Sequence, residues 1–215
     1  MTETRLDKPH VTIAPDGSLD HAEIECGCFL GEDEMPAPLP FNEAMAKIKN
    51  WVRANSLNII AYGTGCGAIE MRPLGTSRFD MERIGITMAP TSRQSNVLVV
   101  SGYLSVKTLK RVIRAYEQMP MPKWTVGLGS CTIDGGMYWD SYNTVKQVDR
   151  YLPLDIYIAG CMPRPEALIA GFKELMEKIK RGEANGWNEY LQNLDTYKAN
   201  QRKVITDWGM PAYNW

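Results

Sequence analysis

Residues 57–67 read LNIIAYGTGCG, an apolar run that passes directly into a glycine-rich turn carrying a cysteine. Three further apolar runs, at residues 96–100, 124–128 and 154–159, are likewise followed by a glycine within two residues. Nearly continuous runs of β-branched and aliphatic residues are typical of strands that are covered on both faces of a parallel sheet. We therefore predict four such strands.

Helical patterns are predicted between or after these strands, over residues 106–118, part of 141–150, and 165–180. Alternating strands and helices predict βαβ units, and hence an α/β fold with an open, doubly wound parallel sheet and helices on both faces. An amphipathic helix over residues 42–54 precedes the first strand, and Gly182 ends the last helix.

The chain divides into three parts on this basis. An irregular N-terminal extension spans residues 1–40, the α/β domain spans residues 41–182, and a polar tail with scattered aromatic residues spans residues 183–215. We expect the tail to lie on a partner or on the domain surface. A terminal helix with a frayed end is the alternative.

The composition is that of a globular protein, with 44% hydrophobic and 23% charged residues among 215. Lys and Arg number 24 and Asp and Glu number 25, so the formal net charge is −1. A near-neutral chain gives no support to nucleic-acid binding, which requires a basic surface. No apolar run approaches the roughly 18 residues of a membrane span, and the first residues are too polar for a signal peptide. We expect a cytoplasmic protein, which leaves room for a partner in a membrane.

Five cysteines are the most informative residues: Cys26, Cys28, Cys66, Cys131 and Cys161. An odd number in a chain without a signal peptide argues against a disulfide framework. The last three each follow a predicted strand within a few residues. Because the carboxyl ends of parallel strands share one edge of an open sheet, we expect these three thiols to converge there.

Three thiolates at one edge indicate an iron–sulfur cluster or a zinc ion, and the only two histidines lie near the N-terminus. Zinc sites usually contain Cys-x-x-Cys pairs, and the chain has none. A cubane cluster needs thiolates spread around a larger object, which separate loops provide. Small residues beside the thiols let the backbone approach such a ligand closely: Gly65, Gly67, Gly129, Ser130 and Gly160. Buried, unligated thiols are the alternative.

Residues 63–68 also match the Gly-x-Gly-x-x-(Gly/Ala) fingerprint of dinucleotide-binding folds, and they follow a predicted strand. Those folds place an acidic residue near the end of the second strand, where it binds the ribose. The second predicted strand ends at Ser101 and Gly102, whereas Asp80 and Glu82 precede it. Nucleotide binding is therefore kept only as an alternative.

Several stretches within residues 42–180 carry a specific resemblance. They are GCGAIEM (65–71), RFDMERIG (78–85), GSC (129–131), GGMY (135–138), VDR (148–150), PLDIY (153–157) and GCMPRPEAL (160–168). In this order they resemble the small cluster-bearing subunit of complex I, of membrane-bound nickel–iron hydrogenases and of their sulfur-reducing relatives. The resemblance implies a flavodoxin-like α/β domain that holds one 4Fe-4S cluster.

The resemblance also implies partners and a location. The partners would be a large catalytic-type subunit, ferredoxin-like cluster subunits and a proton- or ion-translocating membrane arm. The chain would then sit peripherally at the cytoplasmic face of the cell membrane, held by these subunits. In complex I the segment similar to residues 78–83 lies near the quinone cavity, which implies coupling to the membrane subunits through Arg78, Asp80 and Arg83. A solvated helix face is the alternative for this charged segment.

One departure from the family pattern bears on the cluster ligands. The complex I form has two adjacent cysteines before the Ala-Ile-Glu stretch, and hydrogenases have Cys-x-x-Cys there. In this chain Cys66 matches the first of the adjacent pair, and Gly67 replaces the second. The motifs therefore supply three ligands, Cys66, Cys131 and Cys161. Either Cys26 or Cys28 supplies a fourth, or one iron lacks a protein thiolate; we favour the open iron.

An iron without a thiolate is a Lewis acid that could bind a soft sulfur ligand. The expected function is that of the terminal subunit of a complex I-related membrane oxidoreductase. It would use ferredoxin-derived electrons to reduce sulfane sulfur, such as polysulfide, at a three-cysteine cluster, coupled to ion pumping. The alternative is a pure electron relay to quinone or to a nickel–iron centre in the partner.

Overall fold

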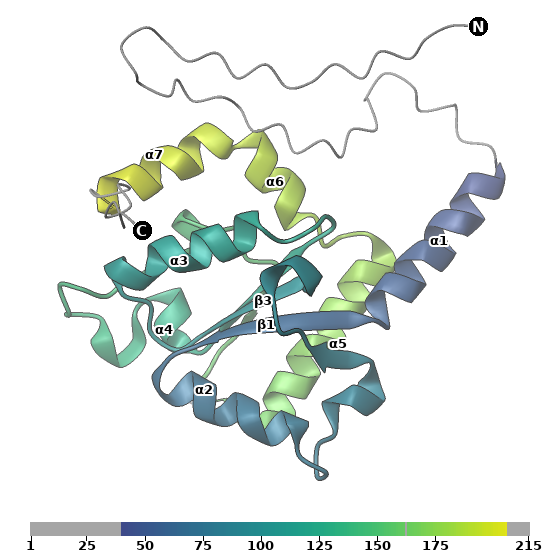
Figure 1. Ribbon diagram of the computed structural model, residues 1–215, viewed down its shortest axis with the longest axis horizontal. Helices are drawn as coiled ribbons and strands as arrows, with labels where there is room; N and C mark the ends of the chain where they lie inside the picture. The colour runs from purple at the N-terminus through teal and green to yellow at the C-terminus, as the bar shows by residue number, and fades with distance from the viewer. Residues whose placement is uncertain (1–39, 162, 206–215) are drawn as a thin grey trace, which may run out of the picture. The chain divides into compact units, whose positions relative to one another are not determined.

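The computed structural model describes the backbone of residues 40–161 and 163–205 and the side chains from Met45 onward (Figure 1). Five parallel strands form one sheet: β1 (Leu57–Gly63), β2 (Ile86–Met88), β3 (Val97–Ser101), β4 (Trp124–Leu128) and β5 (Ile156–Ile158). Their order in the sheet is β2-β1-β3-β4-β5. This is the flavodoxin-like order, which confirms the predicted fold class.

Helices cover both faces of the sheet, as predicted (Figure 1). They are α1 (Pro40–Ala54), α2 (Gly65–Met71), α3 (Val106–Glu117), α4 (Ser130–Ile133), α5 (Pro165–Arg181), α6 (Gly186–Gln192) and α7 (Leu194–Val204). On one face α5 packs with the ends of α1 and α2, and on the other face α3 packs with α6 and α7. None of the helices in the described part of the chain is both long and apolar enough to cross a membrane.

The central strand β3 shows why the sheet needs two cores. Val97 and Val99 point into the core under α5, while Leu98 and Val100 point into the core under α3. All residues of β3 and β4 are buried. A strand that contributes to both cores has no solvent face, which is why its sequence reads as an unbroken apolar run.

The structure differs from the sequence predictions in two elements. The edge strand β2 was not predicted, because it has three residues and only Ile86 is buried. The helix predicted in part of residues 141–150 is wrong: this segment is a loop that ends in a single 3₁₀ turn at Val148–Arg150. Its apolar residues Val145 and Val148 instead fill the core beside α3, and the Val145 N–H donates to the Leu104 carbonyl at 2.7 Å.

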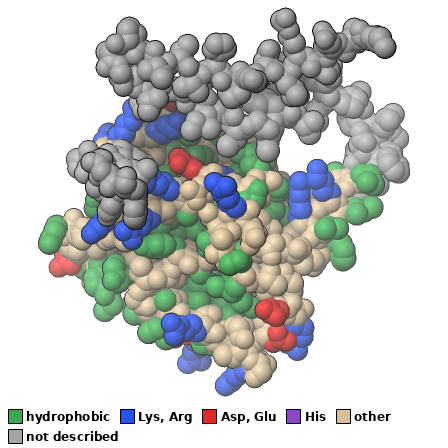
Figure 2. Space-filling view, in the orientation of Figure 1, with side chains coloured by type: hydrophobic (Ala, Val, Ile, Leu, Met, Phe, Trp, Pro, Cys, Tyr) green, Lys and Arg blue, Asp and Glu red, His purple; other side chains and the backbone are tan. Residues whose placement is uncertain are grey.

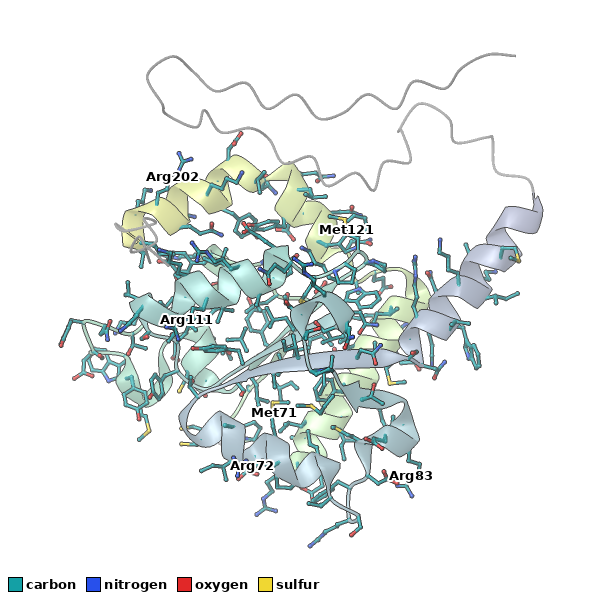
Figure 3. All side chains as sticks on the ribbon, in the orientation of Figure 1. Met71, Arg72, Arg83, Arg111, Met121 and Arg202 are labelled. Atoms are coloured by element: carbon teal, nitrogen blue, oxygen red, sulfur yellow. The ribbon has the colours of Figure 1, made fainter. Side chains whose placement is uncertain are left out.

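Residues 183–205 fold against the domain. Tyr190 of α6 and Ile205 after α7 are buried in the core under α3. Gln201 is also buried, and its side-chain amide donates to the Tyr151 carbonyl at 2.8 Å. Basic side chains lie on the outer sides of α3 and α7, where Lys and Arg gather in Figure 2. Arg111 extends from α3 and Arg202 from α7 in Figure 3. Contact of this region with a partner stays a prediction.

A close approach between α2 and the end of β3 depends on Gly67. A Cβ atom at this position would lie 2.6 Å from the Gly102 nitrogen and 2.7 Å from the Ser101 carbonyl carbon. The Thr64 hydroxyl holds the two segments together, because it donates to the Ser101 carbonyl at 3.2 Å and to the Tyr103 carbonyl. Any side chain at position 67 would therefore force backbone to move.

We predict that Gly67→Ala lowers the free energy of unfolding by about 1–3 kcal/mol, the usual cost of overpacking against a fixed neighbour. Gly75→Ala is the matched control, because a Cβ at Gly75 would meet nothing within 4 Å. It should change the free energy of unfolding by less than about 0.5 kcal/mol. Urea unfolding of the purified chain measures both values, and equal effects of the two substitutions would contradict the close approach.

Candidate metal centre

The strand ends form one row across the sheet. Gly63 of β1 pairs with Ser101 of β3, Ser101 pairs with Leu128 of β4, and Leu128 pairs with Ile158 of β5. Because these residues are in register, the loops that follow them leave the sheet at the same edge. The row thus fixes which residues can share a site.

The three predicted ligands follow this row at the same distance along the sequence. Cys66, Cys131 and Cys161 each come three residues after the row residue of their own strand. All three line a single pocket that opens to solvent. Cys66 and Cys161 are exposed, and Cys131 is half-buried. The predicted convergence of the thiols is therefore present in the structure.

The surroundings of Cys131 disfavour its thiolate form. Burial raises the pKa of the Cys131 thiol, and the nearby Cys161 and Cys66 thiols raise it further. The backbone N–H of Met137 donates a hydrogen bond to the Cys131 sulfur, which acts in the opposite direction. A thiolate at Cys131 is thus disfavoured, first by burial and then by its neighbours, unless a cation shares the site.

Four of the five small residues predicted to contact the ligand also line the pocket: Gly67, Gly129, Ser130 and Gly160. Hydrogen bonds join the loops after β4 and β5, because the Gly129 N–H donates to the Ile158 carbonyl at 2.8 Å and the Ser130 N–H donates to the Gly160 carbonyl at 2.9 Å. The fifth residue, Gly65, is not among the pocket residues.

The remaining pocket residues were not identified from the sequence: Gly102, Tyr103, Leu128, Met137, Tyr138 and Pro163. Gly102 and Tyr103 follow β3, whose last residue belongs to the same row as those of the cysteine-bearing strands. The loop after β3 leaves the sheet at the same edge as the cysteine-bearing loops, so its position is predictable from the topology. The loop carries no thiol, so the cysteine pattern does not indicate it.

The chemistry of the donor set is compatible with an iron–sulfur cluster. Among the side chains of residues 45–161 and 163–205, no three His, Cys, Asp or Glu residues form a group that could hold a single metal ion. The three thiols nevertheless surround one pocket, whose atoms are almost entirely apolar. A cluster presents separate irons to separate thiolates, so its ligands need only surround a common space.

The other residues singled out in the sequence do not belong to this pocket or are not described by the structure. Cys26 and Cys28 lie outside the described residues. Nucleotide binding gains no support, because the second strand is β2 and the residues after it, Ala89 and Pro90, are not acidic. The segment 78–83 lies beside the edge strand β2, away from the row of strand ends.

In that segment the Arg78 guanidinium lies 5.4 Å from the centre of the Phe79 ring, and Asp80 has a left-handed backbone with φ of 41°. Arg72 and Arg83 extend outward in the same region of Figure 3. These residues are placed for contact with another surface or with solvent, and a coupling role for Arg78, Asp80 and Arg83 stays a prediction.

Several known proteins are similar to this chain. The B subunit of the F(420)H(2) dehydrogenase of Methanosarcina mazei is 45% identical over 139 residues, which cover 65% of this chain and 76% of that protein. The B subunit of the NADH-quinone oxidoreductase of Rubrobacter xylanophilus is 41% identical over 162 residues, which cover 75% of this chain and 64% of that protein.

A solved structure is also similar. It is a chain of the membrane-bound sulfane sulfur reductase, described as an archaeal respiratory membrane complex, with a TM-score of 0.72 and 51% sequence identity. The similarity covers 75% of this chain and 92% of that chain. A family model described as NADH ubiquinone oxidoreductase, 20 Kd subunit, matches residues 45–175, well over half of the chain. The chain therefore belongs to the family of NADH ubiquinone oxidoreductase 20 kDa subunits.

Proposed function

We propose that this chain is the terminal cluster subunit of a membrane-bound oxidoreductase and that it reduces sulfane sulfur. Cys66, Cys131 and Cys161 would hold one 4Fe-4S cluster and leave its fourth iron without a protein thiolate. The observation that carries the proposal is the row of strand ends, which brings these three thiols, and no fourth thiol among the described residues, to one pocket.

Position 67 supports the open iron. Related complex I subunits would have their second adjacent cysteine here, but the Gly67 Cα already packs against the backbone of Ser101 and Gly102. A thiol cannot be added at this position without moving β3 or α2. The sulfane sulfur reductase chain, at 51% identity, supports the same chemistry by its described activity.

The bound cluster would supply electrons one at a time and an iron with a free coordination position. In the overall reaction two electrons break one S–S bond of a sulfane sulfur compound. A polysulfide dianion also takes up one proton and leaves as hydrosulfide and a dianion that is one sulfur shorter. An organic trisulfide takes up two protons and leaves as a thiol and a hydropersulfide. The electrons would come from a ferredoxin-like donor. Within this chain, Cys66, Cys131 and Cys161 would bind the group, and the opening of the pocket to solvent would let a soluble sulfur ligand reach it.

The proposed partners follow from the family. They are a large catalytic-type subunit, ferredoxin-like cluster subunits and a membrane arm that pumps ions. Two relatives are, by their names, single subunits of larger oxidoreductases, which supports a multi-subunit assembly. We place the chain peripherally at the cytoplasmic face of the membrane, held there by its partners.

A second candidate is an electron relay without sulfur chemistry. It is favoured by the 41% identity to an NADH-quinone oxidoreductase subunit, in which quinone is the named acceptor. The two candidates differ in whether a soluble sulfur ligand can reach an iron of this subunit.

We predict that Cys66→Ala, Cys131→Ala and Cys161→Ala each abolish the EPR signal of this cluster in the intact complex. Each should lower sulfur-reducing activity by more than the roughly 10–100-fold that loss of an outer-shell partner costs. The double variant Cys26→Ala/Cys28→Ala is the matched control and should keep the signal. Loss of the signal in that control would make one of these two residues the fourth ligand.

We also predict that ethanethiol changes the EPR spectrum of the dithionite-reduced complex. Ethanethiol is a soft ligand without an S–S bond, so it consumes no electrons. The reason for the expected change is direct binding to an iron that lacks a thiolate. An unchanged spectrum, together with no release of hydrosulfide from polysulfide, would favour the relay.

A further inference from the structure

The loop after β3 contributes a different kind of residue to the pocket. In the row of strand ends, Ser101 of β3 stands between Gly63 of β1 and Leu128 of β4. The loops after β1, β4 and β5 bring thiols to the pocket, whereas the loop after β3 brings Gly102 and Tyr103. The loop after β3 therefore contributes an aromatic ring to the pocket where the other three loops contribute a thiol.

Tyr103 is held firmly in this position. A Cβ at Gly65 would lie 3.1 Å from the Tyr103 ring, so the ring packs on the backbone just before Cys66. The Tyr103 carbonyl accepts a hydrogen bond from the Thr64 hydroxyl, which ties the loop to the start of α2. The ring also contacts Tyr138, with centroids 4.9 Å apart and an interplanar angle of 58°.

Tyr138 is fixed by a lysine on the following segment. The Lys146 ammonium donates to the carbonyls of Tyr138 at 3.1 Å, Ser141 at 2.8 Å and Trp139. Tyr138 directly follows Met137, whose N–H donates to the Cys131 sulfur. The two rings thus join the loop of Cys66 to the loop of Cys131, and each is a little more than a third exposed, at 36% and 39%.

We propose that Tyr103 and Tyr138 form the wall against which the sulfane sulfur chain binds. This inference rests on the proposed function and names the contacts of the substrate in that site. Sulfur is large and polarizable and makes favourable contacts with aromatic rings. The described residues that line the pocket carry no charged side chain, which favours the uncharged chain of an organic trisulfide over a polysulfide dianion.

Lys146 is a positioning residue in this arrangement. Its ammonium contacts backbone carbonyls at the rim and is not among the pocket residues, so it holds the Tyr138 segment without meeting the substrate. Its side-chain stem also packs near Gly135, where a Cβ would lie 3.1 Å from the lysine Cδ.

The test uses the intact complex and separates ring contact from hydroxyl chemistry. Tyr103→Ala and Tyr138→Ala should raise the KM for diethyl trisulfide, and the ethanethiol concentration for half-maximal EPR change, by about tenfold. Tyr103→Phe and Tyr138→Phe keep the rings and should stay within about twofold. Tyr142→Ala is the matched control, because Tyr142 is on the same loop, is fully exposed and does not line the pocket.

The possible outcomes distinguish a failure of this proposal from a failure of the proposed function on which it rests. If the unaltered complex neither reduces diethyl trisulfide nor responds to ethanethiol, the proposed function fails, and the proposed role of the two rings fails with it. If the unaltered complex responds and the alanine variants behave like Tyr142→Ala, only the wall is wrong. If the phenylalanine variants raise the KM and the half-maximal ethanethiol concentration as much as the alanine variants do, the effect comes from the hydroxyls and not from the rings. If the alanine variants lose the EPR signal that the complex shows without added ligand, the rings are needed to keep the cluster bound. Either of these two results would contradict the proposal that the rings contact the substrate.

Discussion

The register of four parallel strands is the constraint on which the candidate site depends. Gly63, Ser101, Leu128 and Ile158 pair in one row, and each cysteine follows its row residue by three positions. A strand that slipped by one residue would turn its side chains to the opposite face and move its loop by about 3.3 Å along the sheet. Because β3 and β4 are buried on both faces, such a slip would disrupt two cores at once. The two cores thus fix the register of the strands, and the register fixes the positions of the three thiols in the loops.

This arrangement also sets the electrostatic condition for metal binding. Burial first, and then the neighbouring Cys161 and Cys66 thiols, raise the pKa of the Cys131 thiol. Metal binding requires thiolates and releases their protons, so a bound cation would relieve the repulsion that the pocket creates. The Met137 N–H already favours the charged form of the Cys131 sulfur. The pocket is therefore better suited to a ligand that brings positive charge than to three free thiols.

The convergence of the cysteines could be predicted from the sequence, although one strand was missed. The missed strand β2 lies at the edge of the sheet and supplies no pocket residue, so its omission did not disturb the relative order of β1, β3, β4 and β5. Tyr103 was overlooked for a different reason: a tyrosine in a loop carries no metal-binding signal by itself. Its role depends on contacts with Gly65 and Tyr138, which are 38 and 35 residues away in the chain. The helix expected within residues 141–150 failed because the apolar spacing there serves a loop that packs beside α3.

The glycine at position 67 and the tyrosine at position 103 are linked through one short piece of backbone. Gly67 packs against Ser101 and Gly102, and Tyr103 follows directly. A cysteine at position 67 would push this backbone away from α2 and so displace the ring that rests on Gly65. In this chain a side chain at position 67 is therefore incompatible with the present course of the backbone that leads into Tyr103. The glycine at position 67 and the position of the Tyr103 ring are thus parts of a single arrangement, which under the proposed function leaves one iron of the cluster open to a sulfur ligand.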